Sequence, residues 1–334
     1  MLARTSSPPV SAVLHGLGRF GLHLLRAWLD RPDGGIDIVA IQDAHHSLAS
    51  AAALLQQDAK VSFADCRVAA EDGALRLDLP GRQPLRLAYW HGPAAGSPWL
   101  GRADWWLECS GDFASGEAAR AFLRGRTRRV IVSATCPGAD QTLVFGYNHE
   151  HFDRRAAVLS YGSCTVNAFV PLAAWLHARY GVAEAEVGVI HNVPPHRLAG
   201  HPHPVRRPCT LQTEGPRLLP FLAAERFHVD YVLIPYTGPS LIDFRFELAR
   251  PAAAAALLDA LQASCSTGPL RGLYALEAGT PATAALALRP ESAVLSRPLA
   301  RLHGRRLVLP AGFDNENSAV RYLDLLEAVA QRGG

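Results

Sequence analysis

The stretch "GLGRFG", residues 16–21, limits how this chain can fold more than any other feature of its sequence. It has the spacing G-x-G-x-x-G and joins an apolar segment, residues 11–14, to an amphipathic segment rich in leucine. A second apolar segment, residues 36–43, follows and ends in Asp43. This order predicts a strand, a tight turn, a helix and a second strand, which together make one βαβ unit.

The same turn has the chemistry of a phosphate-binding loop. Glycine allows the backbone to bend sharply and approach a pyrophosphate, and the helix behind it offers free N–H donors. Asp43 ends the next strand, where a carboxylate can accept hydrogen bonds from ribose hydroxyls and repel a 2′-phosphate, so we expect NAD rather than NADP. Arg19, His45 and His46 would weaken that preference. A glycine-rich turn can also serve only to close a helix–strand contact.

The remaining segments predict an α/β protein with two domains. At 334 residues the chain is too long for one ordinary core. In its first half strand-like and helical segments alternate, which is typical of a parallel, doubly wound sheet. The second half is expected to be α+β, with a mostly antiparallel sheet. We expect strands at 84–90, 103–111, 128–135, 186–193, 229–237, 241–249 and 305–313, and helices at 115–125, 168–180, 216–227 and 251–264.

Composition excludes several classes of protein. With 49% hydrophobic and 19% charged residues the chain should form a globule rather than stay disordered. The net charge of +3 comes without a basic stripe interleaved with aromatic residues, so no nucleic-acid partner is expected. No segment has the roughly 18 apolar residues of a membrane span. The six cysteines show no paired spacing, which predicts free thiols in the cytoplasm.

The stretch "LSYGSCTVNAF", residues 159–169, is the first that suggests catalysis. Cys164 precedes an apolar, helix-like run. A helix N-terminus favours the thiolate through its peptide dipoles, and the N–H of the cysteine itself can donate to an oxyanion. Cys164 is therefore a candidate nucleophile. The alternative is a small buried hydrophobe, which is the usual role of a free cysteine.

A nucleophilic thiol needs an imidazole within reach to take its proton. His191 is the best candidate because it follows the apolar run "EVGVI", and residues after a strand emerge at the sheet edge where α/β proteins build their sites. His149, His196, His201 and His203 are competitors in the sequence. The pattern is equally compatible with His191 being a hydrogen-bonded residue at a strand end.

These motifs together resemble those of glyceraldehyde-3-phosphate dehydrogenases, in order and over nearly the whole chain. "GLGRFG" is similar to the family's G-F-G-R-I-G, "SCTVNAFVPL" to its S-C-T-T-N-C-L-A-P, and "IHNV" stands where the family has H-S-Y-T. Further similarities pair "WLECSGDF" with E-S-T-G-x-F, "RRVIVSAT" with R-V-I-I-S-A-P, "FGYNHEHFD" with G-V-N-H-x-x-Y-D, "PSLIDFRFEL" with V-S-V-V-D-L-T-V-E-L, and "FDNENSAVRYLDL" with Y-D-N-E-W-G-Y-S-N-R-V-V-D-L.

The resemblance implies a homotetramer of chains that each have a Rossmann domain at 1–163, completed by a helix at 315–334, and a catalytic domain at 164–314. It implies that the Cys164 thiolate adds to an aldehyde with His191 as its base, that hydride passes to NAD, and that phosphate releases the resulting thioester. The implied cofactor contacts are Gly16, Gly18, Arg19, Phe20, Gly21, Asp43, Ser133 and Asn315. The implied substrate contacts are Ser163, Thr165 and Gly215.

The sequence departs from the family at the positions that bind phosphate. The family's threonine in H-S-Y-T and arginine in R-V-P-T-P-N correspond here to Pro194 and Leu233, and its T-G pair to Glu214-Gly215. Each lost phosphate contact removes roughly 1.5–3 kcal/mol. An arginine- and histidine-rich loop could restore anion binding, or could be a solvated or intersubunit loop. Its members are Arg197, His201, His203, Arg206 and Arg207.

Three functions are compatible with this pattern. The first is an NAD-dependent aldehyde dehydrogenase or acyl reductase that acts on a substrate other than glyceraldehyde 3-phosphate. The second is a phosphorylating glyceraldehyde-3-phosphate dehydrogenase with an unusual anion loop. The third is a catalytically quiet relative that binds NAD and a partner protein. The presence of both Cys164 and His191 favours an enzyme.

Overall fold

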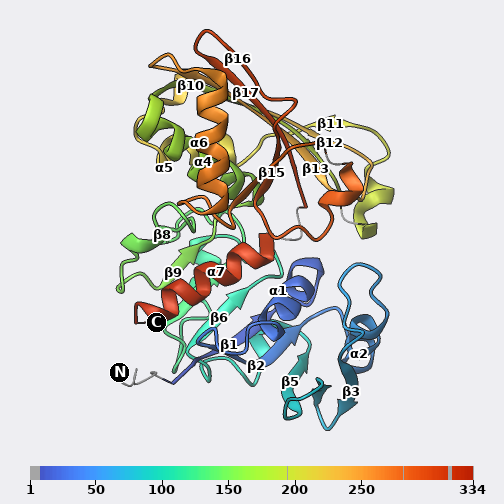
Figure 1. Ribbon diagram of the computed structural model, residues 1–334. Coiled ribbons are helices and arrows are strands. Elements are labelled where there is room, and N and C mark those ends of the chain that lie inside the picture. Colours follow the sequence, from blue (N-terminus) through green and yellow to red (C-terminus); the bar gives the residue numbers. More distant parts are fainter. Residues whose placement is uncertain (1–7, 194, 281, 315–317, 334) are drawn as a thin grey trace, which may run out of the picture. The chain divides into compact units, whose positions relative to one another are not determined.

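The computed structural model describes residues 8–193, 195–280, 282–314 and 318–333, which form two compact units, each with its own sheet (Figure 1). The first unit comprises Met1–Leu143, His149–Tyr161 and Tyr322–Gly334, and the second comprises Val144–Asn148 and Gly162–Arg321. The chain therefore passes between the units more than once. Its last helix, α7 (Ser318–Gln331), belongs to the first unit from Tyr322 onward.

The first unit is built on a nine-stranded sheet in the order β3-β4-β5-β2-β1-β6-β7-β9-β8. All pairs from β5 to β8 are parallel, whereas β3, β4 and β5 are antiparallel neighbours. In chain order, strands are added first on one side of β1 and then on its other side, which is the doubly wound order of a Rossmann fold. The elements are β1 Val10–His15, α1 Arg19–Leu29, β2 Ile36–Asp43, α2 Leu48–Gln57, β3 Arg67–Glu71, β4 Ala74–Asp78, β5 Leu85–His91, β6 Trp105–Glu108, α3 Gly116–Arg120, β7 Arg129–Val132, β8 Gln141–Thr142 and β9 Val158–Ser160.

Apolar residues on both faces of the central strands explain the parallel centre. Val13 and Leu14 of β1 and Trp105 and Trp106 of β6 are all fully buried. Parallel strands need cover on both faces, and their sequences are accordingly almost continuous apolar runs. α7 contributes to this core, because Tyr322 is fully buried and its hydroxyl donates to the carbonyl oxygen of Ile131 at 2.7 Å.

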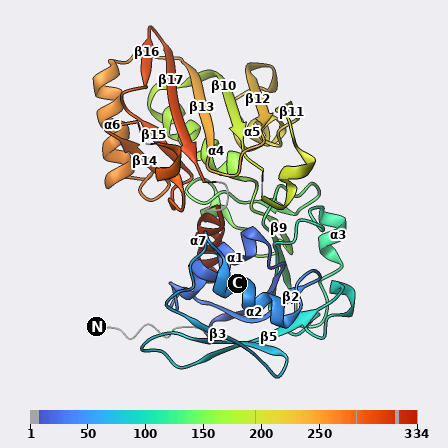
Figure 2. The same ribbon diagram turned by 90° about the vertical axis from the view of Figure 1, so that its right-hand side faces the viewer.

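The second unit has an eight-stranded, mostly antiparallel sheet in the order β11-β12-β10-β13-β17-β15-β14, with β16 paired to β17. Only β10–β12 and β14–β15 are parallel among its described pairs. Figure 2 shows β10 between β12 and β13. The elements are α4 Cys164–Tyr180, β10 Val182–His191, β11 Val205–Arg206, α5 Leu211–Leu218, β12 Phe227–Leu233, β13 Ser240–Leu248, α6 Ala254–Ser266, β14 Tyr274–Glu277, β15 Ala293–Ser296, β16 Arg301–His303 and β17 Arg306–Phe313.

One face of this second sheet is buried against helices and the other is open. Along β10 buried residues alternate with exposed ones, so that Val187, Val189 and His191 lie on the buried face and Ile190 on the open face. Phe169 of α4 covers the buried face, and its ring stacks on that of Phe227 at 5.0 Å. We refer to the buried face as the inner face, because it carries Cys164 and His191.

The α/β class, the doubly wound first sheet and the mostly antiparallel second sheet are confirmed, but individual elements differ from the sequence prediction. α4 begins at Cys164, four residues before the predicted start at residue 168, because Ser163 caps the helix. The helix predicted at 216–227 is wrong. α5 ends at Leu218, and Pro220 excludes helical backbone just beyond it. The hairpin of β3 and β4 was not predicted.

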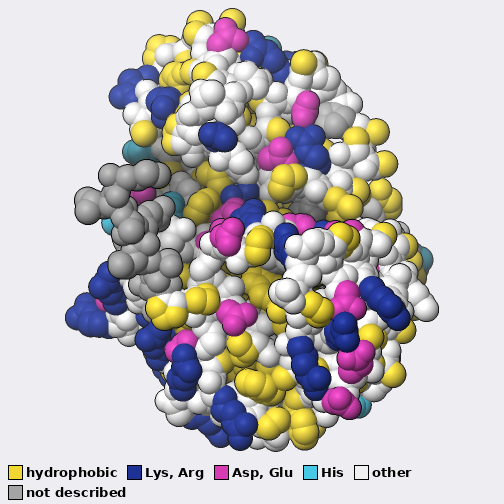
Figure 3. All heavy atoms as spheres, turned by 60° about the horizontal axis from the view of Figure 1, so that its bottom comes forward, with side chains coloured by type: hydrophobic (Ala, Val, Ile, Leu, Met, Phe, Trp, Pro, Cys, Tyr) yellow, Lys and Arg dark blue, Asp and Glu magenta, His cyan; other side chains and the backbone are white. Residues whose placement is uncertain are grey.

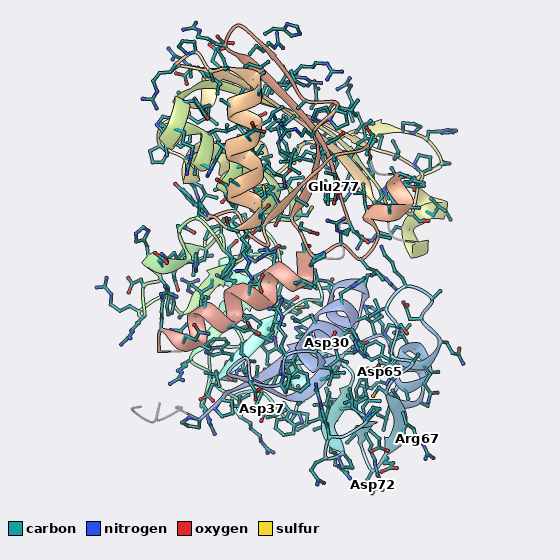
Figure 4. All side chains as sticks on the ribbon, in the orientation of Figure 1. Asp30, Asp37, Asp65, Arg67, Asp72 and Glu277 are labelled. Atoms are coloured by element: carbon teal, nitrogen blue, oxygen red, sulfur yellow. The ribbon has the colours of Figure 1, made fainter. Side chains whose placement is uncertain are left out.

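Many charged side chains on the surface of the described residues are paired with opposite charges. Arg26 of α1 donates to Asp65 at 2.6 Å and also contacts Asp30, and Figure 4 shows both acids close to this helix. On the face in Figure 3, basic and acidic side chains are interspersed with hydrophobic ones. Among the described helices, none combines the length and the hydrophobicity that crossing a bilayer requires.

Candidate active site

The N-terminus of α4 places the Cys164 thiol at the start of a 17-residue helix. Ser163 is its N-cap, with extended backbone, and its hydroxyl oxygen accepts from the N–H of Val166 at 3.3 Å. The side-chain amide of Asn167 donates to the carbonyl oxygen of Ser163 at 3.0 Å. These two bonds fix the backbone around Cys164, so that its half-buried side chain has a defined position.

His191 lies against this thiol. Its Nε2 is 3.6 Å from Sγ of Cys164, and its Nδ1 is 2.8 Å from the carbonyl oxygen of Asn192. A carbonyl oxygen only accepts, so Nδ1 carries the proton and Nε2 presents a lone pair to the thiol. The structure therefore brings together the predicted nucleophile and base, in the tautomer that a base requires.

The imidazole of His191 is held by neighbouring strands. Its ring centroid is 5.2 Å from that of Tyr231 and 5.9 Å from that of Phe313. Asn192, which orients Nδ1, is fixed in turn, because its N–H donates to the Ser240 hydroxyl at 3.1 Å and its side-chain amide donates to the carbonyl oxygen of Gly238 at 2.6 Å. The orientation of His191 therefore depends on β13 as well as on β10.

The resting thiol is protonated. Burial and, to a smaller extent, the neighbouring Cys209 thiol raise the pKa of the Cys164 thiol to about 12, against the opposing effect of the backbone N–H groups of Cys164 and Thr165. The sequence predicts that the helix N-terminus lowers the pKa of this thiol, but burial raises that pKa by more. A thiol in this environment reacts as a nucleophile only when a base accepts its proton, and His191 is in contact to do so.

A chain of hydroxyl and thiol groups borders Cys164. Ser163 Oγ is 3.1 Å from Thr165 Oγ1, the Thr210 hydroxyl donates to Ser163 Oγ at 3.3 Å, and Thr165 Oγ1 is 3.6 Å from Sγ of Cys209. Ser163 and Thr165 were predicted from the sequence. Thr210 and Cys209 were not, because their positions depend on how α5 packs beside α4 and no local pattern marks them.

The third predicted substrate contact, Gly215, lies within α5. A β-carbon there would approach Cε1 of Phe227 to 2.6 Å, so packing alone requires a glycine. Its neighbour Glu214 is buried, with its carboxylate 3.4 Å from the guanidinium of Arg217. Neither observation gives these two residues contact with a substrate.

Of the positions that differ from the family's phosphate site, Leu233 and the Glu214-Gly215 pair are described. Leu233 is the register partner of His191 across β12 and β10, and Pro194 lies outside the described residues. In the arginine- and histidine-rich loop, Arg206 pairs with Asp230 at 2.6 Å. Arg207 has its backbone N–H bonded to the carbonyl oxygen of Tyr231 at 3.1 Å, and its side chain is exposed.

In the first unit the glycine turn has the shape that a dinucleotide requires. Gly16 has φ +96°, and a β-carbon there would lie 2.7 Å from Cα of Ser110. A β-carbon on Gly21 would overlap the carbonyl oxygen of Gly16, whereas Gly18 faces open space. Gly18 is the N-cap of α1 and no side chain caps the helix, so its first N–H groups are available to an anion.

Asp43 lies at the end of β2, as predicted, and organises this turn. One carboxylate oxygen accepts from the N–H of Leu17 at 2.7 Å, and the other accepts from the N–H groups of His45 at 2.8 Å and His46 at 2.7 Å. Burial raises the pKa of Asp43, but these backbone donors and the His46 ring lower it by more. The residue is therefore a carboxylate at neutral pH, directly beside the turn.

The other predicted cofactor contacts are Arg19, Phe20, Ser133 and Asn315. Arg19 forms an ion pair with Asp58, and the Phe20 ring packs edge-on against Tyr322, with centroids 5.5 Å apart. Ser133 follows β7, and its N–H bonds to the carbonyl oxygen of Glu108 at 2.9 Å. Asn315 lies outside the described residues. The open helix N-terminus, the unfilled space at Gly18 and the adjacent carboxylate fit a nicotinamide dinucleotide.

Comparison with known proteins agrees with this arrangement. No family model matches the chain. It is similar to the protein named glyceraldehyde-3-phosphate dehydrogenase from Kitasatospora aureofaciens, with 30% identity over 96% of this chain and 98% of the relative. The protein of the same name from Cereibacter sphaeroides is 29% identical over 92% of this chain and 94% of the relative. For the chromosomal protein of Cupriavidus necator it is 29% over 96% and 98%. The chain belongs to the glyceraldehyde-3-phosphate dehydrogenase family of nicotinamide-dependent oxidoreductases.

Proposed function

We propose that this protein is an NAD-dependent aldehyde dehydrogenase or acyl reductase that works through a thioester on Cys164, on a substrate other than glyceraldehyde 3-phosphate. The observation that carries the proposal is the contact of 3.6 Å between Cys164 Sγ and Nε2 of His191, whose other nitrogen is fixed by a backbone carbonyl. Membership of a family of aldehyde oxidoreductases supports the reaction class.

The first unit supplies the cofactor site in this proposal. Gly16, Gly18 and Gly21 would give the backbone room for a pyrophosphate, and the Asp43 carboxylate favours NAD over a cofactor with a 2′-phosphate. When it is bound, the nicotinamide accepts or supplies the hydride. Six free cysteines are usual in a reducing compartment, which supports a cytoplasmic protein.

The chemistry at Cys164 begins with a proton transfer. His191 Nε2 takes the thiol proton as Sγ attacks the aldehyde carbon, and the backbone N–H groups of Cys164 and Thr165 stabilise the oxyanion of the hemithioacetal. Loss of a hydride converts this oxyanion into a thioester, and the thiol proton remains on His191. Attack by water, phosphate or another acceptor on the thioester carbon then regenerates the thiol. The reverse order of steps reduces an activated acyl group to an aldehyde.

The surroundings of His191 support a substrate without a phosphate group. The nearest residue of the neighbouring strand is Leu233, and Arg206 is already paired with Asp230. A phosphorylating glyceraldehyde-3-phosphate dehydrogenase is the second candidate, favoured by the hydroxyl groups of Ser163, Thr165 and Thr210 beside the thiol. These hydroxyls can donate to inorganic phosphate as the acyl acceptor.

Assembly as a homotetramer is part of the proposal. The open face of the second sheet carries Ile190 and Leu241, which are register partners and are 44% and 41% exposed. Apolar side chains of this size at adjacent positions favour burial against another surface. Light scattering of the purified protein would give four times the mass of one chain; a stable monomer contradicts this assembly.

Two measurements test the proposed function. Iodoacetamide should label Cys164 stoichiometrically at neutral pH, and His191→Ala should slow the labelling strongly; slow labelling of the unaltered protein would favour a catalytically quiet relative. NADH formation should be seen with unphosphorylated aldehydes. Phosphate- or arsenate-dependent NADH formation from glyceraldehyde 3-phosphate at the ordinary rate of such enzymes would instead establish the second candidate.

A further inference from the structure

The sheet register determines which side chains share the inner face with His191. Residues directly opposite one another on paired strands point to the same face. Leu233 of β12 is the partner of His191, and Val205 of β11 is the partner of Leu233. One strand spacing, about 4.8 Å, separates His191 from Leu233, and two, about 10 Å, separate it from Val205. An apolar row therefore runs from the catalytic histidine to the edge of the sheet.

This row is accessible to a ligand. Leu233 is half-buried, and Val205 is 38% exposed. The Tyr231 ring, 5.2 Å from that of His191, forms the next inner-face position of β12. Burying such surface against an apolar group is favourable, by roughly 25 cal/mol for each Å² removed from water.

Charged groups of β11 and β12 lie mostly on the opposite face. Arg206 and Asp230, which bond to each other at 2.6 Å, occupy open-face positions, Arg206 next to Val205 and Asp230 next to Tyr231. Arg207 is the exception. Its backbone bond to Tyr231 continues the register, and places Arg207 on the inner face, two positions along the strand from Val205.

We infer that Leu233 and Val205 form an acyl-binding surface beside His191, and that this surface selects unphosphorylated aldehydes with an apolar carbon chain. The inference rests on the proposed function, because it concerns the aldehyde that Cys164 attacks. The carbonyl carbon bonds to Sγ of Cys164, so the carbon chain starts next to His191 and extends along the row. A short carbon chain then contacts Leu233 alone, and a longer carbon chain also contacts Val205.

The principal test is a series of straight-chain aldehydes, from acetaldehyde through butanal to hexanal, with NAD and the full-length protein. We expect kcat/KM to rise about fourfold for each added methylene, which is the ratio that corresponds to about 0.8 kcal/mol. Leu233→Ala should lower kcat/KM for hexanal at least tenfold and leave acetaldehyde nearly unchanged. A flat series in the unaltered protein overturns the inference.

Two variants make the test specific. Val232→Ala removes the same kind of methyl groups from the adjacent open-face position of β12 and should leave the series unchanged. Leu233→Arg should abolish the dependence on chain length and raise kcat/KM for glyceraldehyde 3-phosphate relative to hexanal. Thermal melting of each variant shows that it is folded. A loss for Val232→Ala as large as that for Leu233→Ala would contradict the assignment.

Binding measured without turnover separates this inference from the proposed function. Straight-chain amides cannot be oxidised, and they should protect Cys164 from iodoacetamide with a strength that increases from acetamide to hexanamide. If the amides protect Cys164 in this way but no aldehyde gives NADH, the acyl-binding surface is supported and the proposed function is contradicted. NADH formation that requires a carboxylate or phosphate on the aldehyde, and that is lost in Arg207→Ala, would retain the function and reject the surface.

Discussion

The glycine turn of the first unit and the Cys164–His191 pair of the second lie at the ends of strands and helices, yet they need very different lengths of chain. The turn is made by β1, α1 and β2, and the bond between Leu17 and Asp43 joins residues 26 apart. The pair joins residues 27 apart, but the orientation of His191 depends on bonds from Asn192 to Gly238 and Ser240, which span 46 and 48 positions.

This difference separates two kinds of site. The turn is defined by the space around its backbone, because β-carbons at Gly16 and Gly21 would meet main-chain atoms. The pair is defined by hydrogen-bond direction, because the proton on Nδ1 of His191 decides that Nε2 is the base. Substitutions should therefore damage the turn through shape and cofactor affinity, and the pair through chemistry, without loss of folding.

The largest effect is expected for Cys164→Ser. A hydroxyl is a far weaker nucleophile than a thiol even with His191 as its base, so kcat should fall by roughly 10⁴-fold or more. NAD affinity should stay within about twofold of the unaltered protein, because no residue of the turn changes. Steady-state NADH formation and isothermal titration with NAD measure the two effects. Activity within tenfold of the unaltered enzyme would mean that another group is the nucleophile.

His191→Asn should produce the next largest effect and a diagnostic pH dependence. Loss of a general base lowers the rate by roughly 10²- to 10⁴-fold near neutral pH. Burial raises the pKa of Cys164 to about 12, so without the base the small thiolate fraction grows about tenfold with each pH unit below that value. The activity of the variant should therefore rise steadily as the pH rises, whereas that of the unaltered enzyme should not.

His203→Asn is the matched control, since His203 is exposed in the same unit. For His191→Asn, the initial rates of iodoacetamide labelling and of NADH formation are measured over the same pH range. The two rates should rise with pH with the same slope. A flat profile for this variant would show that another group deprotonates the thiol.

The same contrast explains how much could be predicted from the sequence. The βαβ unit, Asp43 and the helix behind Cys164 were predictable because periodicity and glycine spacing are local. The apolar run before His191 favoured this residue over the competing histidines, and its contact with Cys164 agrees, while its role as the base stays a prediction. Its tautomer was not predictable, since Gly238 and Ser240 fix Asn192 from another strand.

The misses have a common physical cause. Cys209 and Thr210 reach the site only through the packing of α5 beside α4, and no periodic pattern encodes such a contact. The raised pKa of Cys164 also depends on burial by surrounding residues rather than on its position in a helix. For Gly215, the substrate contact stays a prediction, and the structure adds that Phe227 leaves no room for a β-carbon there.

A moderate effect on the turn is expected for paired glycine substitutions. Gly18→Ala places a methyl group in open space and should leave the thermal stability unchanged, while weakening NAD binding by about tenfold or more through the lost approach of the pyrophosphate. Gly21→Ala forces its β-carbon against the Gly16 carbonyl and should also destabilise the fold, by roughly 1–3 kcal/mol. Equal destabilisation by both would contradict the assigned roles.

The smallest effect is expected for Cys209→Ala. The Cys209 thiol raises the pKa of Cys164, so its removal should lower that pKa. A larger thiolate fraction at a given pH should then speed iodoacetamide labelling of Cys164 by roughly two- to fivefold at strongly alkaline pH, where Cys209 is itself ionised. Peptide mapping would assign the label to Cys164. Cys209→Ser should act in the same direction, because a serine hydroxyl does not ionise in this pH range.

Cys265→Ala is the control for this last comparison. Burial and Glu291 raise the pKa of Cys265 to about 12, and Cys164 is not among the groups that shift it. Labelling of Cys164 should therefore be unchanged in Cys265→Ala. Faster labelling in Cys209→Ala alone would place the effect in the thiol and hydroxyl chain beside the helix N-terminus. Slower labelling would mean that Cys209 positions Thr165 and its N–H donor, so that the pair is sensitive to shape as well as to proton transfer.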